Sequence, residues 1–170
     1  GGNLDEDGKV AFPNAQFVLW KKEWAFWTND PDLSGFKIAQ YVPLLIDCAN
    51  RNIPPIQDRL TLIDREEEIV PGIHAMFTPG HTPGHMALII SSGKEKLLYL
   101  SDTALHPIHL EYPDWVSAAD LNPADTVSSR HKAIDWAIAE DALVLAHHFP
   151  YPGLGRIVKK NDGGKWIPVE

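Results

Sequence analysis

Residues 77–85, which read Phe-Thr-Pro-Gly-His-Thr-Pro-Gly-His, constrain the fold of this chain more than any other segment. Two Pro-Gly pairs exclude a helix here, because proline has no amide hydrogen and its ring clashes with the preceding helical turn. His81 and His85 are therefore presented from a stiff loop. Imidazoles held in fixed positions are typical of metal sites, and the alternative is a proline-rich turn with two surface histidines.

An apolar hairpin follows this loop. Residues 86–90 and 96–100 are two short strand-like runs, and residues 91–95 read as the turn between them. The second run is followed by Asp102. Because a hairpin brings the chain back to the edge where it began, Asp102 is predicted at the same sheet edge as His81, as a candidate metal ligand. The alternative is an aspartate that caps a turn after a strand.

A third strand ends in the same way. Residues 142–146 are apolar and run into His147 and His148, which begin a loop rich in proline and glycine. Strand ends that offer His, Asp and His suit a divalent transition metal, since imidazole binds zinc, manganese and iron, and a carboxylate can bridge two ions. The sequence therefore predicts a metal site at one edge of a sheet.

At these positions the chain resembles the metallo-β-lactamase-fold hydrolase superfamily. The pattern of that superfamily is a histidine in a Pro-Gly-His-Thr-Pro loop, an aspartate after a strand and a late histidine after a final strand. His81, Asp102 and His148 match it, and residues 148–155 are similar to the branch that contains lactonases and phosphotriesterases. The resemblance implies that these three residues are metal ligands, that His85 lies behind them or in the substrate pocket, and that His147 lies beside them.

The resemblance also implies a fold and a chemistry. The expected fold is α/β (α+β), an αββα sandwich of metallo-β-lactamase type, and the expected cofactors are two divalent metal ions, zinc first, with manganese, iron or cobalt as alternatives. Asp102 would bridge the ions as the catalytic residue, and a metal-activated water would hydrolyse an ester, a lactone or a phosphotriester. The alternatives are an inactive fragment, a noncatalytic binding module and a glyoxalase-like thioester hydrolase.

One part of the superfamily pattern does not occur in this sequence, namely the His-x-His-x-Asp-His motif that supplies most of the remaining ligands. The first histidine is His74, and the pair Gly1 and Gly2 resembles the residues that commonly follow the motif. We therefore expect residues 1–170 to be the carboxyl-terminal portion of one metallo-β-lactamase-like domain whose amino-terminal part is missing. The full-length parent would be a binuclear hydrolase, whereas this chain alone should bind metal weakly and hydrolyse little.

The composition limits the kinds of partner that this chain can bind. The chain has 170 residues, of which 44% are apolar and 22% charged, enough for one sizeable core. Its net charge of −8 argues against nucleic acid, and no apolar run approaches the length of a membrane-spanning helix. The expected partners are a small-molecule substrate and either a second copy of the chain or the missing amino-terminal segment, which would cover an exposed apolar sheet face.

Other side chains are candidates for substrate contact. His106 and Tyr151 each follow a predicted ligand and are placed in the pocket, with a surface histidine and a packed tyrosine as the alternatives. An aromatic cluster is interpreted as core packing or an oligomer contact in preference to a pocket wall, and it consists of Trp24, Phe26 and Trp27.

Local patterns predict the remaining elements. Proline is expected to interrupt a helix over residues 36–52 near Pro43, whereas Asn122 caps a helix that starts at Pro123 and runs to about Glu140. Further strands are expected at residues 15–20, 60–63 and 73–77, and residues 156–159 and 166–169 should form a closing hairpin.

Overall fold

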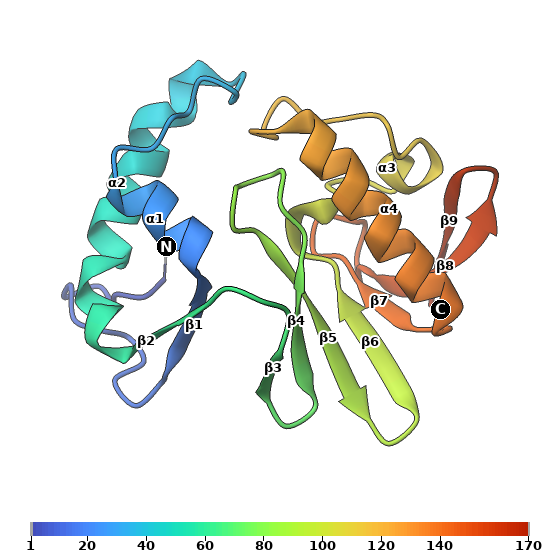
Figure 1. Cartoon of the computed structure of the whole chain (residues 1–170), viewed down its shortest axis with the longest axis horizontal. Helices are drawn as coiled ribbons and strands as arrows, with labels where there is room; N and C mark the ends of the chain where they lie inside the picture. The colour runs from blue at the N-terminus through green and yellow to red at the C-terminus, as the bar shows by residue number, and fades with distance from the viewer. Residues whose placement is uncertain (1, 170) are drawn as a thin grey trace.

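The computed structural model of the chain describes residues 2–169 (Figure 1). Seven strands form one sheet in the order β3-β4-β5-β6-β7-β8-β9. All neighbouring pairs are antiparallel except β6 and β7, which are parallel. The strands are β3 (Glu68–Val70), β4 (Ile73–Phe77), β5 (Met86–Ser92), β6 (Glu95–Tyr99), β7 (Leu143–Leu145), β8 (Leu154–Lys160) and β9 (Gly163–Pro168).

Helix α4 (Pro123–Ala139) covers one face of this sheet. Asn122 caps it by accepting a hydrogen bond from the amide of Asp125 at 3.2 Å, and Pro123 fits the first turn, where its missing amide hydrogen would have had no partner. The helix and the sheet together bury one large apolar cluster. Its members include Met76, Ala87, Leu98, Leu100, Ala133, Ile134, Ala137, Val144 and Ile157.

A smaller unit lies against the other face of the sheet. Strands β1 (Phe17–Trp20) and β2 (Leu60–Ile63) pair in parallel, and helices α1 (Lys21–Thr28) and α2 (Val42–Asn52) lie on their outer side (Figure 1). Trp20, Ile63 and Ala75 form the buried cluster between this unit and the large sheet. Short helical segments complete the chain, namely η1 (Ala39–Tyr41), η2 (Pro54–Arg59), η3 (Ser101–Thr103) and α3 (Ile108–Glu111).

The predicted α/β class is confirmed. The layers run from helices through a two-stranded sheet and the seven-stranded sheet to helix α4, as the sandwich of the superfamily requires. One element was predicted wrongly: the helix expected over residues 36–52 begins only at Val42, and Pro43 lies in its first turn instead of interrupting it. Of the pair used to argue for a missing amino-terminal part, Gly1 lies outside the described residues. No helix within residues 2–169 is long and apolar enough to cross a membrane.

Candidate metal centre

Three strands deliver the predicted ligands to one edge of the large sheet. Strands β4 and β6 are both antiparallel to β5, and β6 is parallel to β7, so β4, β6 and β7 all point the same way. His81 follows β4, Asp102 follows β6, and His147 and His148 follow β7. The carboxyl ends of these strands therefore bring the three loops together.

The carboxylate of Asp102 lies at the centre of this group. Its Oδ2 is 3.9 Å from Nε2 of His81, and its Oδ1 is 2.9 Å from Nε2 of His148. Nε2 of His147 lies 3.5 Å from the same Oδ1, and one ligand atom each from Asp102, His147 and His148 falls within 4.8 Å of the others. The two oxygens thus face different histidine loops. Imidazole nitrogens around a carboxylate are a donor set that fits zinc and similar divalent ions.

A buried carboxylate orients His81. Asp120 has a side chain that is only 1% exposed, and its Oδ1 lies 3.2 Å from Nδ1 of His81, while its Oδ2 accepts the amide hydrogen of Ser117 at 2.8 Å. Burial lowers the pKa of His81, but the hydrogen bond to Asp120 and the charge of Asp102 outweigh it, so the pKa lies above its ordinary value. A carboxylate on Nδ1 leaves Nε2, which faces Asp102, as the atom available to a metal ion.

His85 fixes the loop that carries Asp102. Its Nδ1 lies 2.8 Å from the carbonyl oxygen of Thr78, and its Nε2 accepts the amide hydrogen of Asp102 at 3.0 Å. The Ser101 hydroxyl lies 3.1 Å from the same Nε2. Both ring nitrogens are therefore engaged, which leaves His85 no atom for a metal. Burial lowers the pKa of His85 and keeps the imidazole neutral.

Glu23 connects α1 to the histidine loop. Its carboxylate accepts hydrogen bonds from the amide of Gly84 at 2.8 Å and from Nε1 of Trp27 at 2.7 Å. A Cβ at Gly84 would lie 2.3 Å from the backbone nitrogen of Glu23, and one at Gly80 would lie 2.2 Å from that of Thr126. Both glycines are needed because helices α1 and α4 approach the loop backbone so closely.

Two hollows adjoin the centre. A cavity of about 380 Å³ has His81, His85 and Asp102 in its wall, together with Leu19, Glu23, Thr82, Gly84, Met86, Leu88, Tyr99 and Ser101. Next to His81 there is also an apolar recess of about 100 Å³. It is lined by Trp27, Leu33, Phe36, Leu45, Thr82, Ala119 and Leu121. The metal centre therefore opens onto a larger cavity that is polar at the candidate ligands, and a smaller hydrophobic recess lies beside it.

Several residues that were predicted to contact the substrate do not lie where the sequence suggested. Tyr151 is 99% exposed, because buried Phe149 anchors the loop and leaves the tip of the turn in solvent. His106 is exposed as well, and its Nδ1 accepts the amide hydrogen of Ile108 within its own turn at 3.1 Å. Neither residue lines the two hollows beside the ligands. Trp27, expected to pack in the core or an interface, instead forms part of the apolar recess.

Two site residues were not predicted from the sequence. Asp120 lies in a loop with no strand before it, and Glu23 lies among the aromatic residues of α1. Their roles depend on contacts across 39 and 61 residues of chain. The one local signal is an acidic residue with an apolar neighbour on at least one side, which is too common to identify either.

A profile described as the metallo-beta-lactamase superfamily matches residues 11–148. The chain belongs to this superfamily. An N-acyl homoserine lactonase of Bacillus cereus is 26% identical over 142 residues, which are 83% of this chain and 50% of the relative. An N-acyl homoserine lactonase of a Bacillus species is 48% identical over 87 residues, which are 51% of this chain and 34% of the relative.

Solved structures are similar to this chain over nearly its whole length. AidC, described as a dizinc quorum-quenching lactonase in complex with a product, has a TM-score of 0.84 and 31% identity, and the match covers 100% of this chain and 60% of AidC. The hydrolase AbOPH has a TM-score of 0.83 at 22% identity, which concerns the fold alone. This chain spans half or less of the curated relatives it matches.

Proposed function

We propose that this chain supplies His81, Asp102 and His148 to a two-metal site that hydrolyses lactones, with esters next and phosphotriesters last in preference. The observation that carries the proposal is the Asp102 carboxylate, which turns one oxygen toward His81 and the other toward His148. A carboxylate in that position is suited to bridge two divalent ions. His147 is close enough to share the second position.

His81, Asp102 and the neighbouring His147 are each held by a further side chain. Asp120 orients the ring of His81, and His85 holds the backbone of Asp102. Tyr99 lies with its hydroxyl 3.3 Å from Nδ1 of His147, and burial followed by the charge of Asp102 raises the pKa of Tyr99, so it remains a phenol that can donate. Two divalent ions, when bound, polarise a carbonyl oxygen and bring the pKa of water toward neutrality.

The surroundings of the ligands favour a lactone with an apolar substituent. The recess beside His81 is lined by aromatic and aliphatic side chains, which would accept a short hydrocarbon group next to the reacting carbonyl. The related N-acyl homoserine lactonases act on molecules of this kind by name. We therefore propose an acylated lactone as the substrate, in preference to a thioester.

The remaining metal donors are proposed to come from outside these residues. Three or four donors shared between two ions are fewer than two zinc sites require. The chain alone is then expected to bind metal weakly and to hydrolyse lactones slowly. A second copy of the chain or an additional segment would complete the site.

Cobalt titration tests the site directly, since bound cobalt absorbs in the visible range. The spectrum of the 170-residue chain should change on titration, and His81→Ala, Asp102→Ala and His148→Ala should each weaken the affinity by tenfold or more, on the order expected for a lost ligand. His131→Ala is the matched control, because the one ion pair of His131 within the described residues is with exposed Asp114, at 3.6 Å.

A lactone hydrolysis assay with zinc present separates the enzyme from a noncatalytic module. Ring opening of an N-acyl homoserine lactone that disappears in Asp102→Asn supports the hydrolase. Cobalt binding without turnover, even after the further donors are supplied, would favour the binding module. Rapid turnover by the chain alone would contradict the proposal that the remaining metal donors come from outside these residues.

A further inference from the structure

The turn after β7 presents two histidines, whereas the superfamily pattern accounts for only one of them, His148. The amide of Phe149 donates to the carbonyl oxygen of Ala146 at 3.0 Å, so His147 and His148 occupy the two central positions of a β-turn. Successive side chains of an extended strand point to opposite faces, but those at the centre of a turn can lie together. The two imidazole rings accordingly lie 4.1 Å apart, centre to centre.

This turn is held from both sides. Phe149 is 5% exposed, and its ring packs edge-on against the ring of Trp166 in β9 at 5.0 Å. The amide of Ala146 donates to the carbonyl oxygen of Gly153 at 2.7 Å, which closes the loop that follows the turn. The backbone that carries the two histidines is therefore fixed, although their side chains are 42% and 46% exposed.

The spacing of three donor atoms suits one metal ion. Oδ1 of Asp102 lies 2.9 Å from Nε2 of His148 and 3.5 Å from Nε2 of His147. Zinc bonds of about 2.0 to 2.1 Å in a tetrahedron place the ligand atoms roughly 3.3 Å apart, which lies between the two observed distances. A catalytic zinc ion takes three protein ligands and keeps its fourth position open. Two imidazoles and one carboxylate meet that number.

Tyr99 orients the additional histidine from the neighbouring strand. It pairs with Leu145 across β6 and β7, and its hydroxyl oxygen lies 3.3 Å from Nδ1 of His147. When Nδ1 carries the imidazole hydrogen, the phenol oxygen accepts it, and the lone pair of Nε2 is left for a metal ion. Within residues 2–169, Nδ1 of His148 has no partner of this kind. His147 is therefore the better oriented of the two rings.

We infer that His147 is a metal ligand in its own right, and that Asp102, His147 and His148 together hold one divalent ion. Tyr99 is the positioning residue of His147. The inference rests on the proposed function, because it concerns the second position of the same two-metal site. It gives that position three donors from this chain alone, whereas His81 faces the other oxygen of Asp102.

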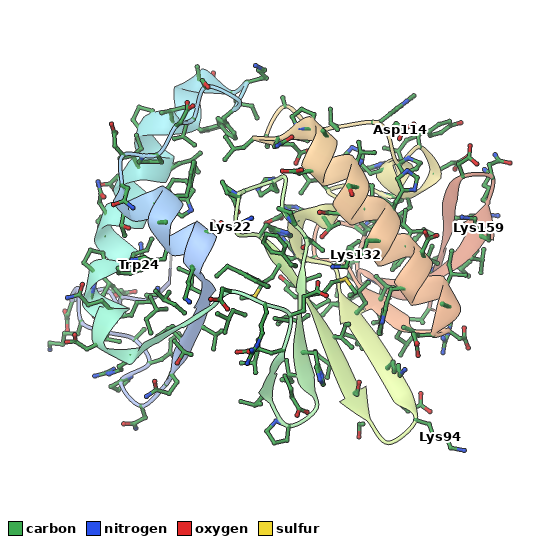
Figure 2. The ribbon with its side chains drawn as sticks, viewed as in Figure 1. Lys22, Trp24, Lys94, Asp114, Lys132 and Lys159 are labelled. Carbon is green, nitrogen blue, oxygen red and sulfur yellow. The ribbon has the colours of Figure 1, made fainter. Side chains whose placement is uncertain are left out.

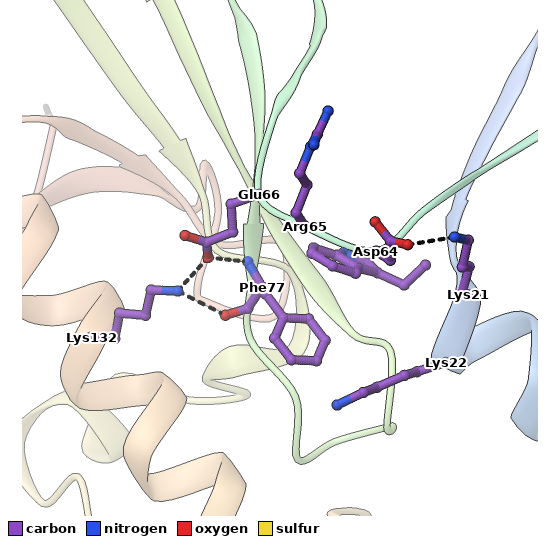
Figure 3. A pocket seen from close by; sticks show the side chains of 8 residues that line it. Lys21, Lys22, Asp64, Arg65, Glu66, Phe77 and Lys132 are labelled. Carbon is purple, nitrogen blue, oxygen red and sulfur yellow. Dashed lines mark hydrogen bonds and ion pairs between the residues drawn. The ribbon is translucent and has the colours of Figure 1, made fainter.

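His81 provides an independent reference on the other side of the metal centre. Its loop starts at the end of β4, where the amide of Phe77 donates to Glu66 at 2.6 Å and its carbonyl oxygen accepts from Lys132 at 3.1 Å (Figure 3). These contacts do not involve the turn after β7. A substitution of His147 should therefore leave the surroundings of His81 unchanged in the metal-free chain.

Long-range ¹H–¹⁵N nuclear magnetic resonance of the histidine rings tests the inference directly, with zinc as the probe. Saturating zinc should move the Nε2 signals of both His147 and His148 to the position of a metal-bound nitrogen, while Nδ1 of His147 carries the hydrogen. His147→Ala should remove one metal-bound ring and leave the signals of His81 in the metal-free chain as they are.

Cobalt titration gives the size of the effect. His147→Ala should weaken the affinity by on the order of tenfold or more, as expected for a lost ligand, with His131→Ala as the control. Tyr99→Phe should weaken it by about tenfold, as expected for the lost partner of a ligand. Tyr151→Phe is the matched control for this change, because Tyr151 is 99% exposed.

The outcomes separate this inference from the proposed function. Metal-bound signals from His148 without any change at His147 would overturn the inference and leave the proposed function standing. No zinc-dependent change at any histidine would overturn both. Equal cobalt affinities of the Tyr99→Phe and Tyr151→Phe chains would overturn the positioning role of Tyr99.

Discussion

The two faces of the seven-stranded sheet are covered very differently by the described residues. On the α4 side Leu98 and Val144 are fully buried, whereas Ile90, Val158 and Ile167 on the opposite side are 37%, 44% and 40% exposed. Successive residues of a strand point to opposite faces, so each strand serves both environments. The α4 face is a filled core that stabilises the fold, and the other face carries the cavity of the metal centre.

The largest expected effect contrasts two adjacent leucines of β6. Leu98→Ala removes a side chain from the filled core and should lower the free energy of unfolding by about 2 to 5 kcal/mol. Leu97→Ala makes the same change on the open face and should cost about 1 kcal/mol. Urea unfolding measures both. Equal losses would show that the open face is covered in solution, for example by a second copy of the chain.

The next effect contrasts two arginines. Arg130 is 1% exposed and donates to the carbonyl oxygens of Thr103 at 3.0 Å and Pro113 at 2.7 Å. Arg130→Met leaves these oxygens unpaired and should cost about 2 to 4 kcal/mol. Arg156 pairs with exposed Asp141 on the open side, so Arg156→Met should cost less than about 1 kcal/mol in the same measurement. A larger loss of stability for Arg156→Met than for Arg130→Met would contradict the difference between the two faces of the sheet.

Asp120→Asn tests how far the α4 side supports the metal centre. The amide keeps the shape of the carboxylate but withdraws its charge from His81, so metal affinity should fall by about tenfold to a hundredfold. Zinc competition against a chromophoric chelator measures the affinity. Asp114→Asn is the control, since Asp114 is exposed and its one ion pair among residues 2–169 is with His131 (Figure 2). Equal effects of the two variants on zinc affinity would show that Asp120 does not support the metal centre.

The smallest effect is on the pH dependence of stability without metal. The raised pKa of His81 gives stability that is present below its ordinary value of 6.5 and is lost as pH rises through the raised value. The lowered pKa of Asp120, where the bond to His81 outweighs burial, gives stability that is present above 3.8 and is lost as pH falls through the lowered value.

The stability difference between the original chain and Asp120→Asn should therefore be greatest between about pH 4 and pH 6.5. Measuring a difference also cancels the contribution of His85, whose lowered pKa acts in the opposite direction to that of His81. Denaturant unfolding across pH 3 to 9 gives the curve. A flat difference would mean that the two side chains do not titrate as a pair.

Local rules predicted the elements that end at the site. The apolar runs became β4, β5, β6 and β7, and proline or glycine stiffens the loops that follow β4 and β7. Asn122 and Pro123 fixed the start of α4 for the same local reason. Pro43 led to a wrong prediction, because proline can either interrupt a helix or occupy its first turn. Only the surrounding chain decides between these two positions.

The partners of the ligands were not predictable in this way. Asp120 reaches His81 because the amides of Leu121 and Asn122 donate to the carbonyl oxygens of His81 and Gly80, which joins two loops about forty residues apart. Tyr151 shows the opposite case. It follows His148 closely in sequence, yet the turn points it into solvent.

The sequence by itself determined which residue types stand at the strand ends, since hydrophobic period, proline and glycine act over a few residues. Only the tertiary structure decided which oxygen of Asp102 faces which histidine, and that both ring nitrogens of His85 bond to backbone and hydroxyl groups. The reason is that burial and pairing of polar groups depend on how distant segments dock, which local patterns do not specify.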